Sequence, residues 1–202
     1  MFVQQMQVGQ MAVFAYLVGD SITGDALIID PADNVHDLLA LAANHGLRIN
    51  YIVNTHGHVD HIGGNADMKK LTGAKIIVHE ADAVMLTATP QAMLRMFGAK
   101  QSPPPDLLVQ DGQIVSVGNV ELKVIHTPGH TRGSVCFYAE KSKLAFTGDT
   151  IFNVDLGRTD LVDGDEIQME HSIRHIIDRW PNDITIYPGH GDSCTMKKVR
   201  GI

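Results

Sequence analysis

Seven residues, Thr55-His56-Gly57-His58-Val59-Asp60-His61, restrict the fold of this chain more than any other stretch. They place three imidazoles and one carboxylate directly after residues 49–53, which have the pattern of a buried strand. Such a run is poorly suited to a core, whereas neutral imidazole and carboxylate are natural ligands of zinc, iron(II) and manganese. Glycine at position 57 lets alternate side chains point inward at close range. The run therefore predicts His56 and His58 on one metal ion and Asp60 and His61 on a second.

Further candidate ligands follow other short apolar strands. Because strand ends that meet at one edge are a usual place for a site on rigid elements, we expect these ligands to join the 55–61 run. They also argue against the competing interpretation of that run as a surface loop with chance histidines. Three later strands each end in a candidate ligand: His130 after 120–126, Asp149 after 144–147 and His190 after 184–187. The remaining histidines are expected to be structural or surface residues: His36, His45, His79, His126, His171 and His175.

Hydrophobic periodicity and turn residues divide the chain into two strand-rich halves flanked by helices. The predicted strands are 2–8, 11–18, 26–29, 49–53, 75–78, 107–109, 113–117, 120–126, 134–139, 144–147 and 184–187. The predicted helices are 34–45, 65–71, 80–86 and 163–179, the first with Asn34 as its capping residue. This pattern indicates one domain over residues 1–202, in which two sheets pack face to face with helices outside.

Composition and charge exclude several classes of function. The chain has 202 residues, of which 44% are hydrophobic and 5% aromatic, and its formal net charge is -7. A general nucleic-acid binder needs a basic face and often stacking aromatics, so no nucleic-acid partner is expected. The apolar run 11–18 is too short to span a bilayer, and the start lacks the basic region of a signal peptide. We therefore expect a cytoplasmic protein with no membrane partner.

The two cysteines, Cys136 and Cys194, form no CxxC motif. A disulfide framework is not expected, and this fits a reducing compartment. Cys136 is predicted to be a small core residue. Cys194 follows closely after His190, so a thiol beside the site is an alternative to a core position.

The motifs together resemble the metallo-β-lactamase superfamily: the HxHxDH run, a lone histidine in TPGHT, then GDT, then PGHG. The resemblance covers almost the whole chain and implies that family's fold, an α/β four-layer αββα sandwich of two mixed β-sheets with helices on the outer faces. The continuation of residues 148–152 (GDTIF), followed by residues 157–160 (GRTD), is most similar to the hydroxyacylglutathione hydrolase branch, the glyoxalase II-like proteins. Asp149 argues against a true zinc β-lactamase, in which a cysteine or serine tends to occupy that motif.

This resemblance implies a metal-dependent thioester hydrolase with two divalent ions, zinc first and iron or manganese as alternatives. Two divalent ions, two aspartates and a bridging hydroxide leave a positive site, which lowers the pKa of bound water. Asp60 and Asp149 would act in catalysis through the metal-bound hydroxide, which attacks the acyl carbonyl of a small-molecule thioester such as an S-acylglutathione. The implied ligands are His56, His58 and His130 for one ion, Asp60, His61 and His190 for the other, and Asp149 as the bridge.

Two further residues complete the predicted site. Asp30 would lie beneath the histidines as an acceptor that orients a ligand or its loop, or it would simply cap a turn. Arg158 would bind a substrate carboxylate, by analogy with a basic residue in the family's matching loop, or it would pair with Asp155 or Asp160. The Met-rich stretch 85–105 is predicted to be a short packed helix plus a rigid connector, with an adaptable apolar wall beside the site as the alternative.

Other chemistries of the same family are alternatives. A mononuclear iron persulfide dioxygenase, a branch that shares the GRTD loop, would use His56, His130 and Asp149 as its ligands. Lactone hydrolysis is a further alternative, whereas a non-catalytic metal-binding domain is disfavoured because all seven ligand positions are filled. The larger glyoxalase II proteins carry a C-terminal helical extension with glutathione contacts. Only twelve residues follow His190 here, so we expect no equivalent contacts.

Overall fold

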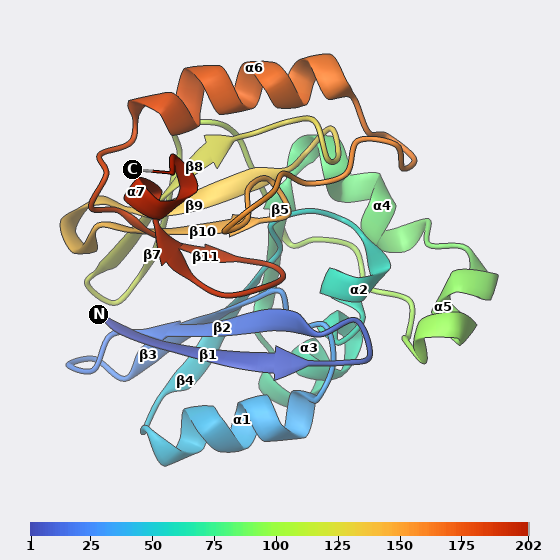
Figure 1. Ribbon diagram of the computed structural model, residues 1–202. Helices are drawn as coiled ribbons and strands as arrows, with labels where there is room; N and C mark the ends of the chain where they lie inside the picture. Colours follow the sequence, from blue (N-terminus) through green and yellow to red (C-terminus); the bar gives the residue numbers. More distant parts are fainter. Residues whose placement is uncertain (202) are drawn as a thin grey trace.

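A computed structural model describes residues 1–201 and contains two mixed sheets of six strands each, packed face to face (Figure 1). The first sheet runs in chain order through β1 (Phe2–Val8), β2 (Val13–Gly19), β3 (Asp25–Ile29), β4 (Arg48–Val53), β5 (Lys75–His79) and β6 (Leu107–Val109). The second sheet runs in the order β12 (Cys194–Thr195), β11 (Thr185–Pro188), β10 (Leu144–Gly148), β9 (Val135–Ala139), β8 (Val120–His126) and β7 (Ile114–Val117).

Parallel pairing brings the ends of the central strands to the same edge. In the first sheet β3, β4, β5 and β6 are mutually parallel neighbours, and in the second sheet β10 and β11 are parallel. The carboxyl ends of parallel neighbours lie together, and this edge is where loops collect functional side chains. The residues that follow β3, β4, β5, β10 and β11 are therefore close in space although they are distant in the sequence.

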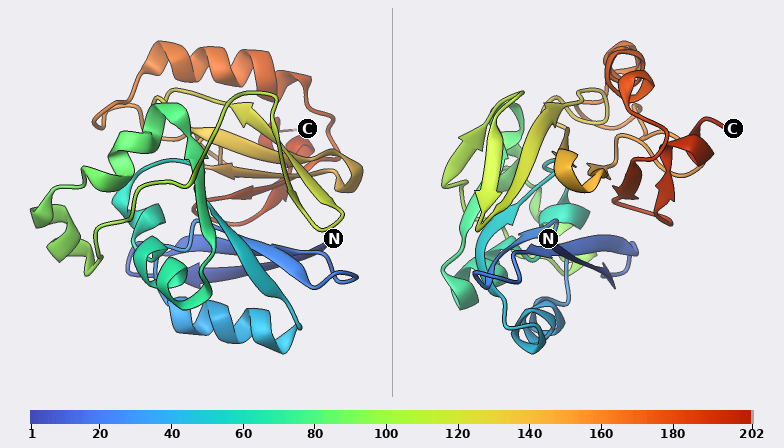
Figure 2. Two further views of the ribbon diagram at one scale, coloured as in Figure 1. Left: turned by 180° about the vertical axis from the view of Figure 1, so that it is seen from behind. Right: turned by 90° about the vertical axis from the view of Figure 1, so that its left-hand side faces the viewer.

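Helices cover the outer faces of both sheets (Figures 1 and 2). Helix α1 and helix α3 lie against the first sheet, and α6 lies over the second. The helices are α1 (Val35–Asn44), α2 (Val59–Ile62), α3 (Asn65–Thr72), α4 (Ala83–Thr87), α5 (Gln91–Phe97), α6 (Glu166–Ile176) and α7 (Met196–Val199). Short 3-10 turns are η1 (Glu80–Asp82), η2 (Glu140–Ser142) and η3 (Ile177–Arg179).

Strand alternation distributes the apolar residues over three core layers. In β3, Ile28 packs toward α1 and α3, while its neighbours Leu27 and Ile29 face the second sheet. The layer between the sheets includes Phe137 and Phe146, both fully buried. A third layer lies under α6 and α7. The central strands are buried on both faces, which explains why they read as continuous apolar runs in the sequence.

The predicted two-sheet architecture is observed, with corrections at several boundaries. Asn34 occupies the predicted N-cap position of α1, but its side chain makes no capping hydrogen bond: its backbone is left-handed (φ 51°), and its carboxamide oxygen accepts instead from the Gly9 N–H at 3.1 Å. The predicted helix 163–179 begins only at Glu166, because the Asp165 carboxylate accepts from the Gln168 N–H and caps it. The strand predicted from residue 11 starts at Val13.

Candidate metal centre

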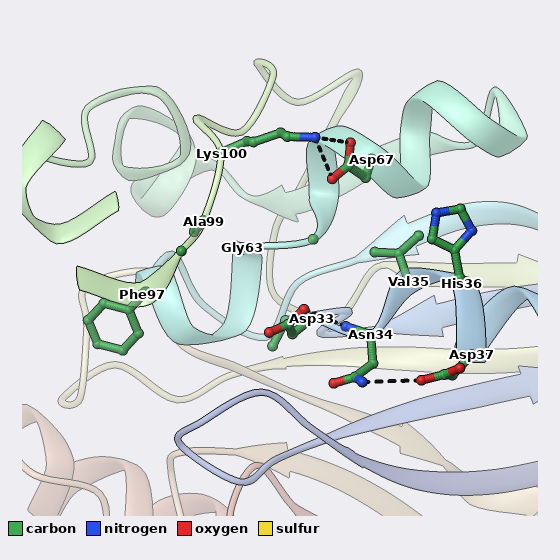
Figure 3. Close-up of a pocket in the computed structure, with 13 residues that line it drawn as sticks. Asp33, Asn34, Val35, His36, Asp37, Gly63, Asp67, Phe97, Ala99 and Lys100 are labelled. Atoms are coloured by element: carbon green, nitrogen blue, oxygen red, sulfur yellow. Dashed lines mark hydrogen bonds and ion pairs between the residues drawn. The ribbon is translucent and has the colours of Figure 1, made fainter. Parts of the chain in front are cut away.

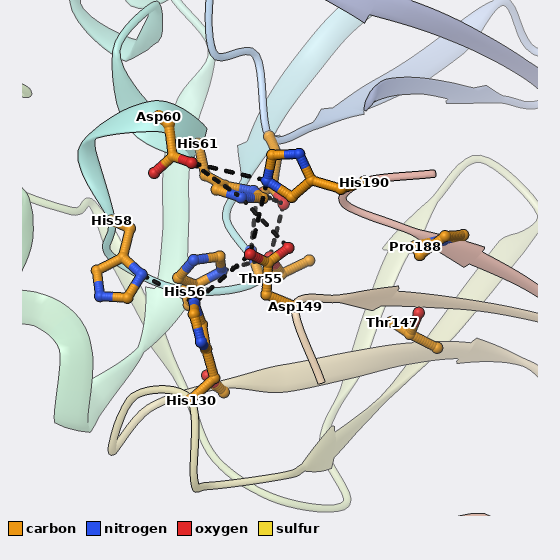
Figure 4. Close-up of polar contacts among 12 residues, drawn as sticks. Thr55, His56, His58, Asp60, His61, His130, Thr147, Asp149, Pro188 and His190 are labelled. Atoms are coloured by element: carbon orange, nitrogen blue, oxygen red, sulfur yellow. Dashed lines mark hydrogen bonds and ion pairs between the residues drawn. The ribbon is translucent and has the colours of Figure 1, made fainter. Parts of the chain in front are cut away.

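The HxHxDH run occupies the turn between β4 and the short helix α2 (Figure 4). The Thr55 carbonyl accepts from the Val135 N–H at 2.9 Å, which ties the run to the first residue of β9 in the other sheet. His58 precedes α2 with an extended backbone, while Asp60 and His61 lie on the helix itself. This change of backbone direction lets one short segment contribute ligands to two neighbouring groups.

The first group consists of His56, His58 and His130, whose ligand atoms all lie within 4.8 Å of one another. His58 Nδ1 is 2.9 Å from His130 Nε2. His130 Nδ1 lies 2.7 Å from the Arg158 carbonyl oxygen, to which it donates, so its Nε2 lone pair faces the group. His56 is buried, and its Nε2 has no hydrogen-bond partner among residues 1–201.

The second group consists of Asp60, His61 and His190, again within 4.8 Å of one another. His190 Nε2 lies 3.7 Å from Asp60 Oδ2. The loop that carries His190 is fixed by the first sheet: the Phe14 N–H donates to the Gly189 carbonyl, and the Tyr16 hydroxyl donates to the Pro188 carbonyl. Each group therefore draws its side chains from both halves of the chain.

Asp149, after β10, lies between the two groups (Figure 4). Its Oδ1 is 3.4 Å from His61 Nε2. Its Oδ2 is 3.5 Å from His130 Nε2 and 3.6 Å from His190 Nε2. One carboxylate thus reaches histidines of both groups, with a different oxygen for His61 and His130.

Asp30 lies directly behind the cluster and is 2% exposed. It accepts from the Thr55 N–H at 2.8 Å, from the Thr55 hydroxyl at 2.6 Å and from His61 Nδ1 at 3.0 Å. Asp30, His56 and His61 also lie close enough to share an ion. We disfavour that grouping, because both Asp30 oxygens are already used by Thr55 and His61.

Glycines make room for the cluster at points where a side chain would enter it. A Cβ at position 189 would lie 2.3 Å from Asp149 Oδ1 and 2.7 Å from His61 Cε1. A Cβ at position 148 would lie 2.4 Å from the Thr55 hydroxyl oxygen, and Gly148 also has a positive φ of 48°. Both clashes involve atoms that belong to the site.

The electrostatics of the cluster favour a bound cation. Burial and neighbouring imidazoles lower the pKa of His56 well below its usual range, and burial with His130 lowers the pKa of His58 to about 4. Burial opposes a charge on His61, but Asp149 and Asp30 outweigh it and raise the pKa of His61. Burial likewise opposes ionisation of Asp149, yet His61 lowers the pKa of that carboxyl. The carboxylates that attract a proton to His61 would attract a metal ion at the same nitrogen.

The donor set fits a pair of divalent metal ions. Within the described chain, three site atoms are buried without any hydrogen-bond partner: His56 Nε2, His61 Nε2 and Asp149 Oδ1. Buried polar atoms are normally paired, so three orphans in one cluster indicate that the partner is a ligand of the protein. Imidazole nitrogens and carboxylate oxygens are the atoms that zinc, iron and manganese accept.

The family comparison agrees with this geometry. The sequence model of the Metallo-beta-lactamase superfamily matches residues 8–190. The chain belongs to the metallo-beta-lactamase superfamily.

Several relatives within the superfamily carry names. A hydroxyacylglutathione hydrolase of Rhodospirillum rubrum is 35% identical over 189 residues, which cover 92% of this chain and 66% of the relative. An uncharacterized protein of Aquifex aeolicus is 32% identical over 201 residues, 99% of this chain and 94% of the relative. The chain spans 61% to 66% of the length of the named hydroxyacylglutathione hydrolases.

Solved structures match the whole fold, which confirms the predicted αββα architecture. The B3 metallo-beta-lactamase BLEG-1 superposes with a TM-score of 0.91 at 27% identity, covering 100% of this chain and 97% of that one. TTHA1623, described in a di-iron-bound form, has a TM-score of 0.87 at 29% identity, covering 97% and 96%. ETHE1 from Myxococcus xanthus has a TM-score of 0.82 at 25% identity, covering 98% and 81%.

The structure gathers all seven predicted metallo-beta-lactamase ligands in this one cluster. Arg158 adjoins it through its carbonyl, which bonds to His130, whereas its side chain is exposed and forms a two-pronged ion pair with Asp160, at 2.9 Å for each nitrogen–oxygen contact. His126 also lies outside the cluster, stacked on His79 with its Nε2 near the Arg132 carbonyl. Cys194 packs in the third core layer with Cys136, so the core position is the observed one.

A cavity of about 340 Å³ lies between α1, α3 and α5 beside the centre (Figure 3). Several of its polar side chains are paired with one another: Lys100 binds Asp67, and the Asn34 amide donates to Asp37. A second cavity, of about 20 Å³, is lined in part by Val59, Asp60 and Met11. The two cavities share four lining residues, Ala32, Asp33, Phe97 and Ala99. Phe97 of the Met-rich stretch thus lines both cavities.

Two residues that hold the site in place were missed by the sequence analysis. The sequence analysis assigns no role to the side chain of Thr55, yet its hydroxyl lies between Asp30 and His56 Nδ1. Asp82 lies in η1 and was read as an ordinary helical residue. Its carboxylate accepts from backbone groups of two ligand loops. One feature of the sequence could have indicated Asp82: it follows shortly after the predicted strand 75–78. In the fold this strand lies beside the strand that precedes the HxHxDH run.

Proposed function

We propose that this chain is a binuclear metal-dependent hydrolase that cleaves a thioester of the S-acylglutathione type. One observation carries the proposal: two three-residue donor groups lie side by side, and Asp149 approaches histidines of both within 3.6 Å. The substrate class is supported by the hydroxyacylglutathione hydrolases that are 31% to 36% identical to this chain.

In this proposal each donor group holds one ion, zinc first and iron or manganese as alternatives. The di-iron-bound form of the structural neighbour at 29% identity supports iron as a real alternative. When bound, two divalent ions supply Lewis acidity that lowers the pKa of water and polarises an acyl carbonyl. The ligands would be His56, His58 and His130 for one ion, Asp60, His61 and His190 for the other, with an oxygen of Asp149 for each.

The chain's own residues fit a substrate whose leaving group needs no proton donor. Burial opposes ionisation of Asp60, but His190 and His61 lower the pKa of this carboxyl, and His61 does the same for Asp149. Both carboxylates are therefore ionised at neutral pH and cannot serve as general acids. A thiol with a pKa of about 8.5 leaves readily as the thiolate. This preference for an easy leaving group favours a thioester over an amide.

We further propose that the cavity between α1, α3 and α5 takes the part of the substrate that is remote from the bond being broken. Phe97 provides an apolar contact there, and Lys100 and Asn34 provide polar contacts. In this proposal Arg158 binds a substrate carboxylate with the N–H groups that Asp160 leaves free, since the ion pair uses only Nε and Nη2.

The test combines metal analysis with a panel of thioesters. Protein purified without added metal or chelator should contain close to two metal ions per chain and should hydrolyse S-acyl thioesters. The variant Asp60→Ala should lose one metal and most of the activity, because it removes a ligand of the second group. Asp192→Ala changes an exposed carboxylate near His190 and serves as the matched control. Full activity in Asp60→Ala would contradict the proposal.

A mononuclear iron persulfide dioxygenase is the second candidate. His56, His130 and Asp149 could serve as its two-histidine, one-carboxylate ligand set, since the two rings lie 4.7 Å apart and Asp149 is 3.5 Å from His130. This function would leave the second donor group without a role, which is why we rank it below hydrolysis. One iron per chain together with oxygen uptake on glutathione persulfide would reverse that ranking.

A further inference from the structure

One fully buried carboxylate outside the metal cluster joins two of its loops. Asp82 Oδ2 accepts from the Gly57 N–H at 2.9 Å and from the Thr131 hydroxyl at 2.7 Å. Asp82 Oδ1 accepts from the Gly133 N–H at 2.6 Å. Asp82 is 0% exposed and lies just after β5, the strand that runs parallel to β4. The side chain therefore bonds the loop after β4 to the loop after β8.

These two loops carry every histidine of the first donor group. Gly57 separates His56 from His58, and Thr131 directly follows His130. The second donor group has no contact with Asp82: His61 bonds to Asp30, which also holds Thr55 beside His56, and the His190 loop bonds to β2. No hydrogen bond in the described chain joins Asp82 to Asp60, His61 or His190.

The surroundings of Asp82 are built to accept this side chain. A Cβ at position 133 would lie 2.6 Å from Asp82 Cγ, so glycine is required there for the carboxylate to fit. A Cβ at position 57 would lie 2.6 Å from the Cβ of Met85, the third residue after Asp82. Thr131 is held in turn by Ser134, whose hydroxyl oxygen accepts from the Thr131 N–H at 3.0 Å. Because its oxygens are turned to these donors, Asp82 does not reach a substrate.

We propose that Asp82 is a positioning residue that fixes the His56–His58 segment and the His130 loop relative to each other and so holds the first donor group as one site. The inference rests on the proposed pair of metal ions. It predicts that loss of the Asp82 contacts weakens metal binding at the first site and leaves the second site as it was.

The variant Asp82→Asn tests this with little change in shape. The amide oxygen can replace only one of the two carboxylate oxygens, so its NH₂ group must face the N–H of either Gly57 or Gly133. One orientation frees the Gly57 loop, and the other removes one of the two contacts to the His130 loop, since the Thr131 hydroxyl can still bond to the amide oxygen. Removal of residues that orient metal ligands typically weakens binding 10- to 100-fold. Glu80→Gln is the matched control, since Glu80 lies on the same turn with its side chain exposed.

Ligand variants assign the effect to one site. In an Asp60→Ala background the remaining zinc reports on the first site, and Asp82→Asn should weaken it about 10- to 100-fold in competition with a chelator. In a His58→Ala background the remaining zinc reports on the second site, and Asp82→Asn should leave its dissociation constant unchanged. Equal weakening at both sites, or no weakening at the first, would overturn the inference.

Folding and function are checked separately. Near-ultraviolet circular dichroism of the metal-free variants should match the wild type; if Asp82→Asn does not fold, Thr131→Val removes one of the three donors and should act in the same direction with a smaller effect. A wild type that binds two zinc ions but cleaves no thioester would overturn the proposed substrate and leave the role of Asp82 standing. A wild type that binds no metal would overturn both.

Discussion

Three histidines of this centre use one ring nitrogen for the protein and turn the other toward the cluster. His61 Nδ1 bonds to Asp30, and His130 Nδ1 bonds to the Arg158 carbonyl. His56 Nδ1 lies 3.1 Å from the Thr55 hydroxyl. An outer hydrogen bond of this kind fixes the ring orientation and the tautomer, and it raises the basicity of the inner nitrogen. The donors are thus preformed by ordinary hydrogen bonds.

At the residue scale, the tightest constraint on the centre is Gly189. The variant Gly189→Ala should bind metal at least tenfold more weakly, because the added Cβ would lie 2.3 Å from Asp149 Oδ1 and 2.7 Å from His61 Cε1. Metal content after dialysis against a chelator measures the effect. Ser193→Ala, an exposed change in the same segment, is the control and should retain metal. Undiminished metal content in Gly189→Ala would show that the loop can move away.

His79 gives the metal-free protein a measurable acid sensitivity. Burial and the neighbouring His126 lower the pKa of His79 to about 4, and its Nδ1 accepts from the Ala81 N–H. The unfolded chain binds this proton near pH 6.5, so the stability from neutral His79 is present above that pH and is lost as pH falls from about 6.5 toward 4. His79→Asn keeps a capping oxygen without the titration. Urea midpoints measured from pH 7 to 4 should fall less steeply in this variant than in the wild type.

The ligands could be predicted from the sequence because they occur in short motifs that directly follow recognisable strands. Asp82 could not be predicted, since its partners are 25, 49 and 51 residues away and depend on how the loops fold back. The pairing of Arg158 is the opposite case. Its partner Asp160 is two residues away, and the residues predict an ion pair with Asp155 or Asp160 as the alternative to the substrate role that the family resemblance implies.

At the scale of elements, β2 supports the metal centre from the opposite sheet. Its residue Phe14 donates its N–H to Gly189, and Tyr16 donates its hydroxyl to the Pro188 carbonyl. Pro188 and Gly189 are the two residues that precede His190 in the sequence. The first sheet therefore fixes a loop that emerges from the second.

Removal of the Tyr16 hydroxyl, a single oxygen atom, should clearly lower the free energy of unfolding. Tyr16 is 2% exposed, so Tyr16→Phe leaves the Pro188 carbonyl without that buried donor, at a cost of about 1 to 3 kcal/mol in the free energy of unfolding. Denaturant unfolding measures this loss. Tyr138→Phe is the control, because no hydrogen bond of the Tyr138 hydroxyl is found in residues 1–201. Equal stability of the two variants would mean that water replaces the lost donor.

Element predictions succeeded where the apolar periodicity was strong and failed where single side chains decided a boundary. The buried strands stand out because both of their faces are covered, so they read as unbroken apolar runs. The start of α6 was misplaced because Asp165, rather than a residue near 163, provides the cap. Strand β12 and helix α7 were missed, since two- and four-residue elements carry too little periodicity to detect.

At the scale of the molecule, the two sheets are joined at both ends of β2 by different sets of hydrogen bonds. One end carries the contacts to the His190 loop. At the other end Asp20 accepts from the Asn119 N–H at 2.8 Å and from its side-chain amide at 2.6 Å, linking the first sheet to the β7–β8 turn. These donors, with the Ile22 N–H, lower the pKa of Asp20 to about 2. Asp20 lies six residues after Phe14 along the extended chain, a distance of about 20 Å. No helix among residues 1–201 is long and apolar enough to cross a membrane.

This separation predicts that metal binding and the Asp20 link stabilise the protein independently. At a free zinc concentration 100 times the dissociation constant, one site adds about 2.7 kcal/mol to the free energy of unfolding, and a chelator removes it. Asp20→Ala should lower the stability with and without zinc, because Asn119 loses its acceptor, yet the increment due to zinc should be the same as in the wild type. Effects at such distances usually add to within about 0.5 kcal/mol. Urea unfolding of both proteins, with and without chelator, measures the four free energies, and a smaller zinc increment in Asp20→Ala would mean that the link at one end of β2 helps to hold the metal ligands at the other.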